Sequence, residues 1–171
     1  MKTFFTSDHH FGHTNIIKYE SRPFMDVNTM NNQLIYLWNE TVKPDDVVYH
    51  LGDFALMKKD QIKPIFDQLN GEIHLILGNH DRSKAFYEEI GFKTVRTNAL
   101  IDQYDLTVFL IHDPICAEAA LKRHVDLVLH GHIHGKKKLW NPGSPIVHVG
   151  VDAWDYRPIE FDQILDLKEL K

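Results

Sequence analysis

Cysteine is almost absent from this sequence, and its one copy, Cys116, cannot form a disulfide within the chain. Proteins that depend on disulfides belong to oxidising compartments, so this composition favours a reducing one. The first residues, Met-Lys-Thr-Phe-Phe, are followed at once by polar residues and lack the apolar core of a signal peptide. We therefore expect the chain to be cytoplasmic.

Long apolar runs and an excess of positive charge are also missing. No stretch approaches the roughly 18 apolar residues of a membrane helix, so no membrane contact is expected. The formal net charge of −5 provides no broad basic surface, and long nucleic acid is not an expected partner. The 171 residues contain no repeat and no linker-like segment, which predicts one domain, residues 1–171.

Histidine, by contrast, occurs twelve times. Its imidazole is the commonest metal ligand in proteins, and it titrates near neutral pH. Several of the twelve stand beside aspartate, asparagine or glycine in short motifs, such as SDHHFGH at residues 7–13. This distribution indicates a site that works on a metal ion or a phosphate group.

The hydrophobic pattern predicts an α/β fold. Several apolar runs do not alternate with polar residues, as expected for strands that are covered on both faces. Amphipathic stretches at residues 28–42, 58–69 and 161–170 predict helices, the second of which Pro64 should shorten or bend. The expected strands are residues 3–6, 47–50, 73–77, 106–112, 125–130 and 146–151.

Polar motifs follow five of these strands. They are SDHH at residues 7–10, GD at 52–53, GNHD at 78–81, HDP at 112–114 and GHIHG at 131–135. Because sites in open α/β sheets form at the carboxyl ends of strands, we expect the five motifs to build one shared site.

The alternation of side chains along extended backbone predicts which residues face this site. Asp8 and His10 should point one way and His9 the other. The same spacing brings His132 and His134 together. We therefore predict His10 as a ligand and His9 as an exposed or packing residue.

Asp-x-His, Gly-Asp, Gly-Asn-His-Asp, a lone histidine and Gly-His-x-His, in this order, resemble the calcineurin-like metallophosphoesterases. The flanking HFGHTNIIKYESRPF and VGVDAWDYRP resemble the small single-domain bacterial and phage type. The likeness extends from Thr3 to about Pro158. It implies a four-layer α/β/β/α sandwich and two divalent metal ions per chain.

The resemblance also implies a ligand set and a metal. Carboxylate, imidazole and amide ligands without thiolate favour Mn²⁺, with Fe, Zn and Ni as alternatives. One ion would be held by Asp8, His10, Asp53 and His134, and the other by Asp53, Asn79, His112 and His132, with Asp53 bridging.

Further residues are candidates for catalysis and substrate binding. In the family the histidine of Gly-Asn-His-Asp faces the phosphate, which implies that His80 is the general acid and that Asp81 orients or supports it. Asn15, Arg22 and Arg82 have side chains suited to phosphate oxygens, although surface contacts account for them equally well.

The predicted function is a dinuclear metal-dependent phosphodiesterase that hydrolyses small nucleotide-type diesters with metal-activated water. A nucleotide or protein phosphatase is the alternative. However, protein phosphatases usually continue to Asp-Arg-Gly and carry Gly-Asn-His-Glu, whereas this chain reads GDFALMKK and GNHD. A nuclease normally adds a capping domain, and non-catalytic scaffolds usually lose the catalytic histidine. The expected partner is a small phosphoester, while the substrate and the oligomeric state stay open.

Overall fold

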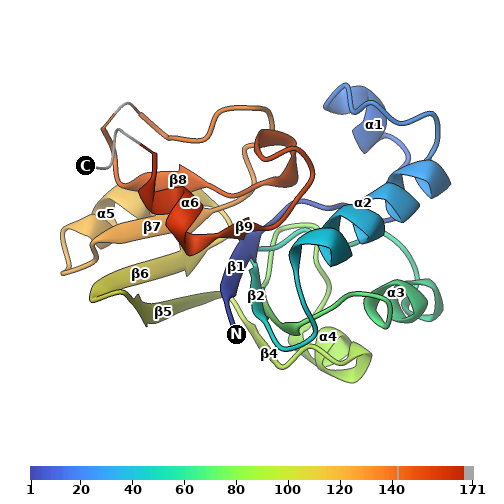
Figure 1. The fold of residues 1–171 in the computed structure, drawn as a ribbon, viewed down its shortest axis with the longest axis horizontal. Helices are drawn as coiled ribbons and strands as arrows, with labels where there is room; N and C mark the ends of the chain where they lie inside the picture. The colour runs from blue at the N-terminus through green and yellow to red at the C-terminus, as the bar shows by residue number, and fades with distance from the viewer. Residues whose placement is uncertain (142, 168–171) are drawn as a thin grey trace.

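Two β-sheets pack face to face and helices cover both outer faces (Figure 1). The structure is a computed structural model that describes residues 1–141 and 143–167. The strand order is β4-β3-β2-β1-β9 in one sheet and β5-β6-β7-β8 in the other. The predicted four-layer α/β/β/α sandwich is therefore confirmed.

The five-stranded sheet takes four of its strands from the N-terminal part of the chain and β9 from near its C-terminal end. Neighbouring strands from β1 to β4 are parallel, and β9 is antiparallel to β1. The strands are β1 (Thr3–Thr6), β2 (Val47–His50), β3 (Glu72–Ile76), β4 (Thr94–Arg96) and β9 (Ile159–Glu160).

The four-stranded sheet begins with an antiparallel hairpin and continues with parallel strands. Tyr104 and Asp105 turn the hairpin with left-handed backbone, which suits a tight two-residue connection. The strands are β5 (Asn98–Gln103), β6 (Leu106–Ile111), β7 (Leu127–His130) and β8 (Ile146–His148).

The longest helix, α2, shows why the helices form where they do. The Asp26 carboxylate accepts the backbone N–H of Thr29 and caps its first turn. Met30, Leu34 and Trp38, four residues apart, form its buried face. The helices are α1 (Ile16–Tyr19), α2 (Val27–Thr41), α3 (Lys59–Phe66), α4 (Lys84–Ile90), α5 (Ala117–Leu121) and α6 (Phe161–Leu165), with 3₁₀ turns at Pro114–Cys116 and Val151–Ala153.

The predicted elements agree with the structure where burial is strong. All six expected strands are present, and the helix predicted at 58–69 ends early, at Phe66, two residues after Pro64. The helix predicted at 161–170 ends at Leu165, and residues 168–170 lie outside the described part of the chain. The sequence missed β4, β5, β9, α4 and α5, which are short or largely exposed.

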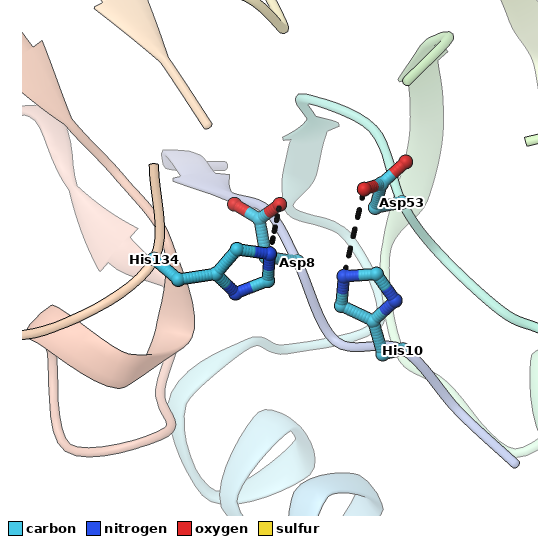
Figure 2. A group of neighbouring side chains, drawn as sticks. All are labelled: Asp8, His10, Asp53 and His134. Carbon is cyan, nitrogen blue, oxygen red and sulfur yellow. Dashed lines mark ion pairs between the residues drawn. The ribbon is translucent and has the colours of Figure 1, made fainter. Parts of the chain in front are cut away.

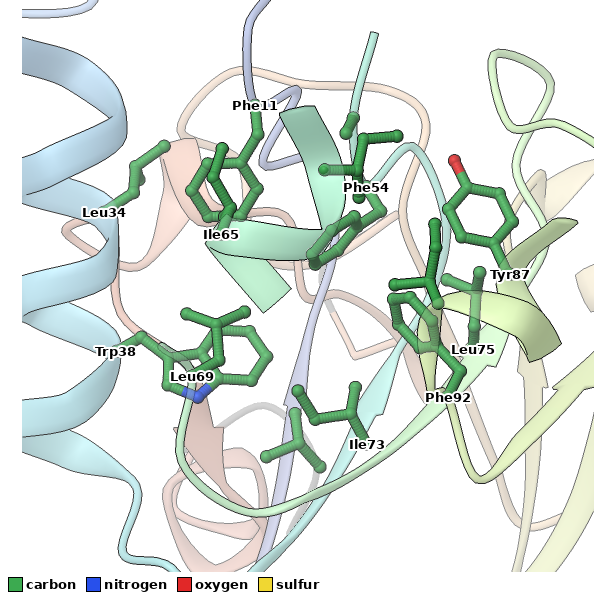
Figure 3. Packing of buried hydrophobic residues seen from close by; sticks show 14 of the residues in the cluster. Phe11, Leu34, Trp38, Phe54, Ile65, Leu69, Ile73, Leu75, Tyr87 and Phe92 are labelled. Carbon is green, nitrogen blue, oxygen red and sulfur yellow. The ribbon is translucent and has the colours of Figure 1, made fainter. Parts of the chain in front are cut away.

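Three apolar clusters hold the layers together. The largest joins the five-stranded sheet to α2, α3 and α4, with Phe54 packed among Phe11, Tyr87 and Phe92 (Figure 3). A second cluster fills the space between the sheets, and a third, around Val128, lies beneath α5. Within the described residues, no helix has the length and apolar character needed to cross a membrane.

The packing of the two sheets positions the loops that matter for function. Beyond β1, the backbone N–H groups of Asp8 and His10 donate to the carbonyls of Gly52 and Asp53, both at 3.0 Å. In the other sheet, Gly131 N donates to the His112 carbonyl at 3.1 Å. Backbone hydrogen bonds therefore tie the loop after β1 to the loop after β2, and the loop after β6 to the loop after β7.

Candidate metal centre

Four side chains converge where the loops of the two sheets meet (Figure 2). Each of Asp8, His10, Asp53 and His134 offers a ligand atom, and these atoms all lie within 4.8 Å of one another. His10 Nε2 is 3.5 Å from Asp53 Oδ2, and His134 Nε2 is 3.8 Å from Asp8 Oδ1. We call these four residues the first ligand group; they are the set that the resemblance implies for one ion.

A second set lies beside the first and shares Asp53 with it. Asn79 Oδ1 is 3.0 Å from His112 Nε2 and 2.9 Å from His132 Nδ1. His112 Nε2 is also 3.5 Å from Asp53 Oδ2. Asn79, His112 and His132, together with Asp53, form the second ligand group, and the structure thus brings together all seven sequence-predicted ligands.

The backbone at these residues differs from the expectation. Asp8, His10 and Asp53 have φ of 59°, 52° and 55°, and His132 and His134 have 73° and 50°. This left-handed conformation is uncommon for residues other than glycine. Asp8 and His10 do face the same side, but the turn of the backbone at each residue places them there, and the alternation of an extended strand does not. The concentration of uncommon backbone at ligand positions is typical of functional sites.

Two positions, Gly52 after β2 and Gly131 after β7, require glycine because other groups lie very close to their backbone. A Cβ at Gly52 would lie 2.5 Å from His112 Nδ1, and one at Gly131 would lie 2.7 Å from Asp8 Oδ2. A Cβ atom essentially never comes this close to another heavy atom, so only glycine fits. These positions let the five-stranded and four-stranded sheets bring their ligands together.

The protonation of His112 argues that the second ligand group suits a cation. Its Nδ1 lies 2.7 Å from the Leu51 carbonyl and donates to it, which leaves Nε2 directed at Asn79 and Asp53. Burial alone would lower the pKa of His112, but the hydrogen bond and charge of Asp53, with the charge of Asp8, raise it to about 9. A proton between oxygen atoms and Nε2 stands where a metal ion would stand.

The first ligand group fits a metal ion for a different reason. Burial lowers the pKa of His10 to about 4, so its imidazole is neutral at pH 7. His10 Nε2 is buried and has no hydrogen-bond partner among the described residues. Burial would raise the pKa of Asp8, yet the imidazoles of His148 and His134 lower it below its usual value. Neutral imidazole and ionised carboxylate are the forms that bind divalent metals.

His80 lies beside the first ligand group with an exposed side chain. Its backbone N–H donates to Asp53 Oδ1 at 2.9 Å, and its ring centroid is 5.5 Å from that of His10. The imidazole is therefore held close to the candidate metals and open to a substrate.

Asp81 does not make the expected contact with the His80 side chain but makes contacts elsewhere. Its carboxylate accepts hydrogen bonds from the backbone of Asp53, Phe54 and Gly78 and from the hydroxyl of Tyr87, at 2.8 to 3.0 Å. These contacts tie the loop after β3 to the loop after β2. Asp81 thus positions the backbone of Asp53, and the geometry gives no support to a direct effect on His80.

Arg22 also has a position that its sequence context did not indicate. Its side chain is fully buried, and its Nε and Nη2 donate to Asp152 at 2.9 and 2.8 Å. Nη1 donates to the His9 carbonyl and Nη2 to the Asp8 carbonyl. Because protein groups occupy the guanidinium, the expected contact with a phosphate has no support in the structure.

Asn15 and Arg82 are both exposed but lie in different surroundings. Asn15 precedes α1 and makes no side-chain cap there. Arg82 has its guanidinium carbon 5.1 Å from the centre of the Phe86 ring and lines a cleft of about 450 Å³ beside His80. Arg82 thus shares a cleft with the site residue His80.

Asp152 is a residue that the sequence reading missed. Its carboxylate binds Arg22, and its Oδ2 lies 3.7 Å from His134 Nδ1, on the far side of the ring from Asp8. Carboxylates that contact the second nitrogen of a ligand histidine orient the ring. The quoted stretches YESRPF and VGVDAWDYRP contain both partners of this ion pair, and only their proximity in the fold reveals it.

His9 packs in the core beneath the loop after β1 that carries Asp8 and His10. It is fully buried, its ring stacks on Phe11 at 5.2 Å, and its Nδ1 lies 2.9 Å from His50 Nε2. Of the two readings, exposed or packing, the packing one is observed. Likewise, His148 on β8 is fully buried, with its Nε2 3.9 Å from Asp8 Oδ2.

Comparisons with known proteins place this geometry in a family. The calcineurin-like phosphoesterase superfamily domain matches residues 1–151. An uncharacterized protein of Methanocaldococcus jannaschii is 36% identical over 98% of this chain and 92% of its own length.

Two solved structures are similar as well. A protein of unknown function from Aquifex aeolicus has a TM-score of 0.77 and 27% identity, over 95% of this chain and 97% of its own. A structure described as a novel archaeal phosphodiesterase has a TM-score of 0.55 and 21% identity, over 88% and 82%. The latter likeness concerns the fold alone.

Proposed function

The chain belongs to the calcineurin-like phosphoesterase superfamily and is a metal-dependent phosphoester hydrolase, and from that premise we propose that it is a dinuclear phosphodiesterase acting on small nucleotide-type diesters. The observation that carries the proposal is the sharing of Asp53 between two ligand groups. Asp53 Oδ2 is 3.5 Å from His10 Nε2 and 3.5 Å from His112 Nε2. One carboxylate so placed suits a bridge between two cations.

The proposed cofactor is a pair of divalent ions. The first ion would be held by Asp8, His10, Asp53 and His134, and the second by Asp53, Asn79, His112 and His132. Bound ions would supply electrophilic stabilisation of the phosphate and an activated water. The donors are carboxylate, imidazole and amide, which favours Mn²⁺, with Fe, Zn and Ni as alternatives.

The proposed role of His80 follows from its place beside this pair. In hydrolysis the water oxygen bonds to phosphorus, and the bond from phosphorus to the leaving oxygen breaks with its electrons on that oxygen. His80 would donate a proton there, and the proton lost by water would pass to solvent. Its exposed imidazole, anchored through its own backbone to Asp53, is open to this contact. Asp81 would act indirectly, by holding the loop of Asp53.

Preference for diesters follows from charge. A diester carries one negative charge, which two cations and one histidine can offset without a cluster of arginines. Arg22 lies near the loop that carries Asp8 and His10, but its guanidinium donates to Asp152 and to backbone carbonyls. One structurally similar protein is described as a phosphodiesterase, which accords with the proposal. The single cysteine keeps the cytoplasm as the expected compartment.

The test is a panel of activities with defined metals. The metal-free protein would be reconstituted with Mn²⁺, Fe²⁺, Zn²⁺ or Ni²⁺, and bound metal counted by elemental analysis. We expect two equivalents and a higher kcat/KM for bis(4-nitrophenyl) phosphate than for 4-nitrophenyl phosphate, with 2′,3′-cyclic nucleotides also hydrolysed. A preference for the monoester would support the phosphatase alternative. Tight, salt-sensitive binding to a long single strand would support a nuclease.

A further inference from the structure

The cleft beside His80 is bordered by the loops that follow β1, β2 and β3. Gly12, Met57, Lys58 and Arg82 line it, together with Asn28 and Asn31 of α2. Its volume of about 450 Å³ lies within the usual range for small-ligand sites. It therefore adjoins the candidate metals on the side where His80 stands.

The charges in this cleft are of one sign. Lys58 and Arg82 line it with His80 and several amide side chains, and no aspartate or glutamate is among its described lining residues. Neither cation forms an ion pair within the described part of the chain, whereas the neighbouring Lys59 and Lys84 are paired with glutamates. In a chain of net charge −5, unpaired cations in one cleft produce a local field that favours an anion.

The cleft also has apolar walls. Val27, Ala55, Leu56 and Met57 line it beside the cations, and Leu56 is 45% exposed. An occupant that matches both features has a small apolar body and an anionic end. A sugar or alkyl group that carries a phosphate has this character.

We propose that this cleft holds the leaving half of the substrate, and that this half bears a second phosphate bound by Lys58 and Arg82. The inference deepens the proposed function and rests on it, because His80 protonates the leaving oxygen only if the leaving group lies on its side. The stacking of Arg82 on Phe86 holds the guanidinium in place, and its planar fork matches phosphate oxygens. The substrate class is then a phosphodiester whose leaving alcohol is itself phosphorylated, such as a nucleotide.

The test uses synthetic diesters in which the leaving group is fixed by chemistry. In methyl 4-(phosphonomethyl)phenyl phosphate and methyl 4-ethylphenyl phosphate, the phenolate leaves because methoxide is a far poorer leaving group. A third compound, 2-phosphonoethyl 4-ethylphenyl phosphate, carries the phosphonate on the half that stays. We expect kcat/KM of the Mn²⁺-loaded protein to be at least about tenfold higher for the first compound than for the other two, since two charge-assisted hydrogen bonds are gained.

Variants connect this preference to the two cations. Lys58→Ala and Arg82→Ala should each reduce the preference several-fold, mainly through KM, and the double variant should abolish it. Lys59→Ala, next in sequence but paired with Glu89 and outside the cleft, is the matched control and should keep it. Circular dichroism and Tm would establish that each variant folds.

The outcomes separate this inference from the proposed function. Equal hydrolysis of all three compounds by the unaltered protein overturns the leaving-group cleft and leaves the phosphodiesterase proposal standing. A preference that survives in the double variant also overturns it. Failure to hydrolyse any of them, with metal bound, overturns both. A preference lost only with Lys58 and Arg82 supports both.

Discussion

The two ligand groups share Asp53 but differ in depth. In the first group the side chains of Asp8, His10 and Asp53 are at most 2% exposed, and His134 is 18% exposed. Of the three residues that belong to the second group alone, His112 is buried, His132 is half-buried and Asn79 is exposed. The first group is supported from behind by the Arg22–Asp152 ion pair, and the second is held mainly by its own contacts around Asn79.

From the same kinds of side chain, the chain thus builds two ligand groups that differ in burial and in support from neighbouring residues. A buried, externally supported position binds an ion with little reorganisation and exchanges it slowly. A position at the surface leaves room for solvent and substrate. We therefore expect the first ion to be the tightly held one and the second to face the phosphate more openly.

Removal of the shared ligand, Asp53, should disrupt both ligand groups. Asp53→Ala is expected to lose both ions and all activity above the uncatalysed rate, because two cations would face each other without the carboxylate between them. Elemental analysis after equilibrium dialysis measures this, with the exposed Asp45→Ala as the control. Two equivalents of metal in Asp53→Ala would show that Asp53 is not a bridge.

Loss of His80 should reduce turnover and leave both ligand groups intact. For His80→Ala we expect a loss of ~10²–10⁴-fold in kcat on diesters with poor leaving groups, as is usual for general acid catalysis. The loss should shrink with a nitrophenolate leaving group, which hardly needs a proton. Measured metal content should equal that of the unaltered protein. An equal loss on good and poor leaving groups would mean that His80 holds the phosphate instead.

Two single substitutions should each weaken metal binding at only one of the two ligand groups. Asp152→Asn should weaken the ion of the first group by about 10–100-fold, because the neutral amide orients His134 less firmly. Asn79→Ala should weaken only the ion of the second group. Metal titration by calorimetry resolves the two classes of site. If both variants weaken the same class, the assignment of ligands to two groups is incorrect.

Metal binding at the second group should depend strongly on pH. His112 has a pKa of about 9 without metal, so at pH 7.5 the ion must displace its proton. Affinity should therefore fall by about tenfold for each pH unit below 9, and binding should release about one proton. Titrations in two buffers with different enthalpies of ionisation measure this release. Binding at pH 7.5 without proton release would contradict the raised pKa.

Substitution of His9, the neighbour of the proposed ligand His10, is expected to have the smallest effect on activity. His9→Ala should lower the free energy of unfolding by ~2–4 kcal/mol, because it removes a fully buried ring packed on Phe11 and Trp38. Metal content and kcat should stay close to those of the unaltered protein. Urea unfolding of the metal-free protein and metal analysis provide the two readouts. His10→Ala, which removes a proposed ligand, should by contrast lower the metal content. A drop in metal content in His9→Ala would reverse the roles of the two histidines.

Much of the fold and of the ligand set could be predicted from local pattern. Apolar runs identified the buried strands, and β4 and β9 escaped notice because elements of three and two residues leave no periodicity to detect. The order of the motifs pointed to the seven ligands that the structure brings together. The reason offered for the directions of Asp8 and His10 was nevertheless wrong, since left-handed backbone at both residues was not visible in the sequence.

Short stretches of sequence encode which atoms are available for chemistry, because ligand types and their places at strand ends are local properties. The role of each of those atoms depends on the tertiary structure. The tertiary structure paired Arg22 with Asp152 across 130 residues, turned Asp81 towards the backbone of Asp53, and placed Lys58 and Arg82 in one cleft whose described lining residues include no carboxylate. Burial and pairing depend on residues distant in the chain, so no local pattern could distinguish an arginine that binds substrate from one that supports a ligand loop.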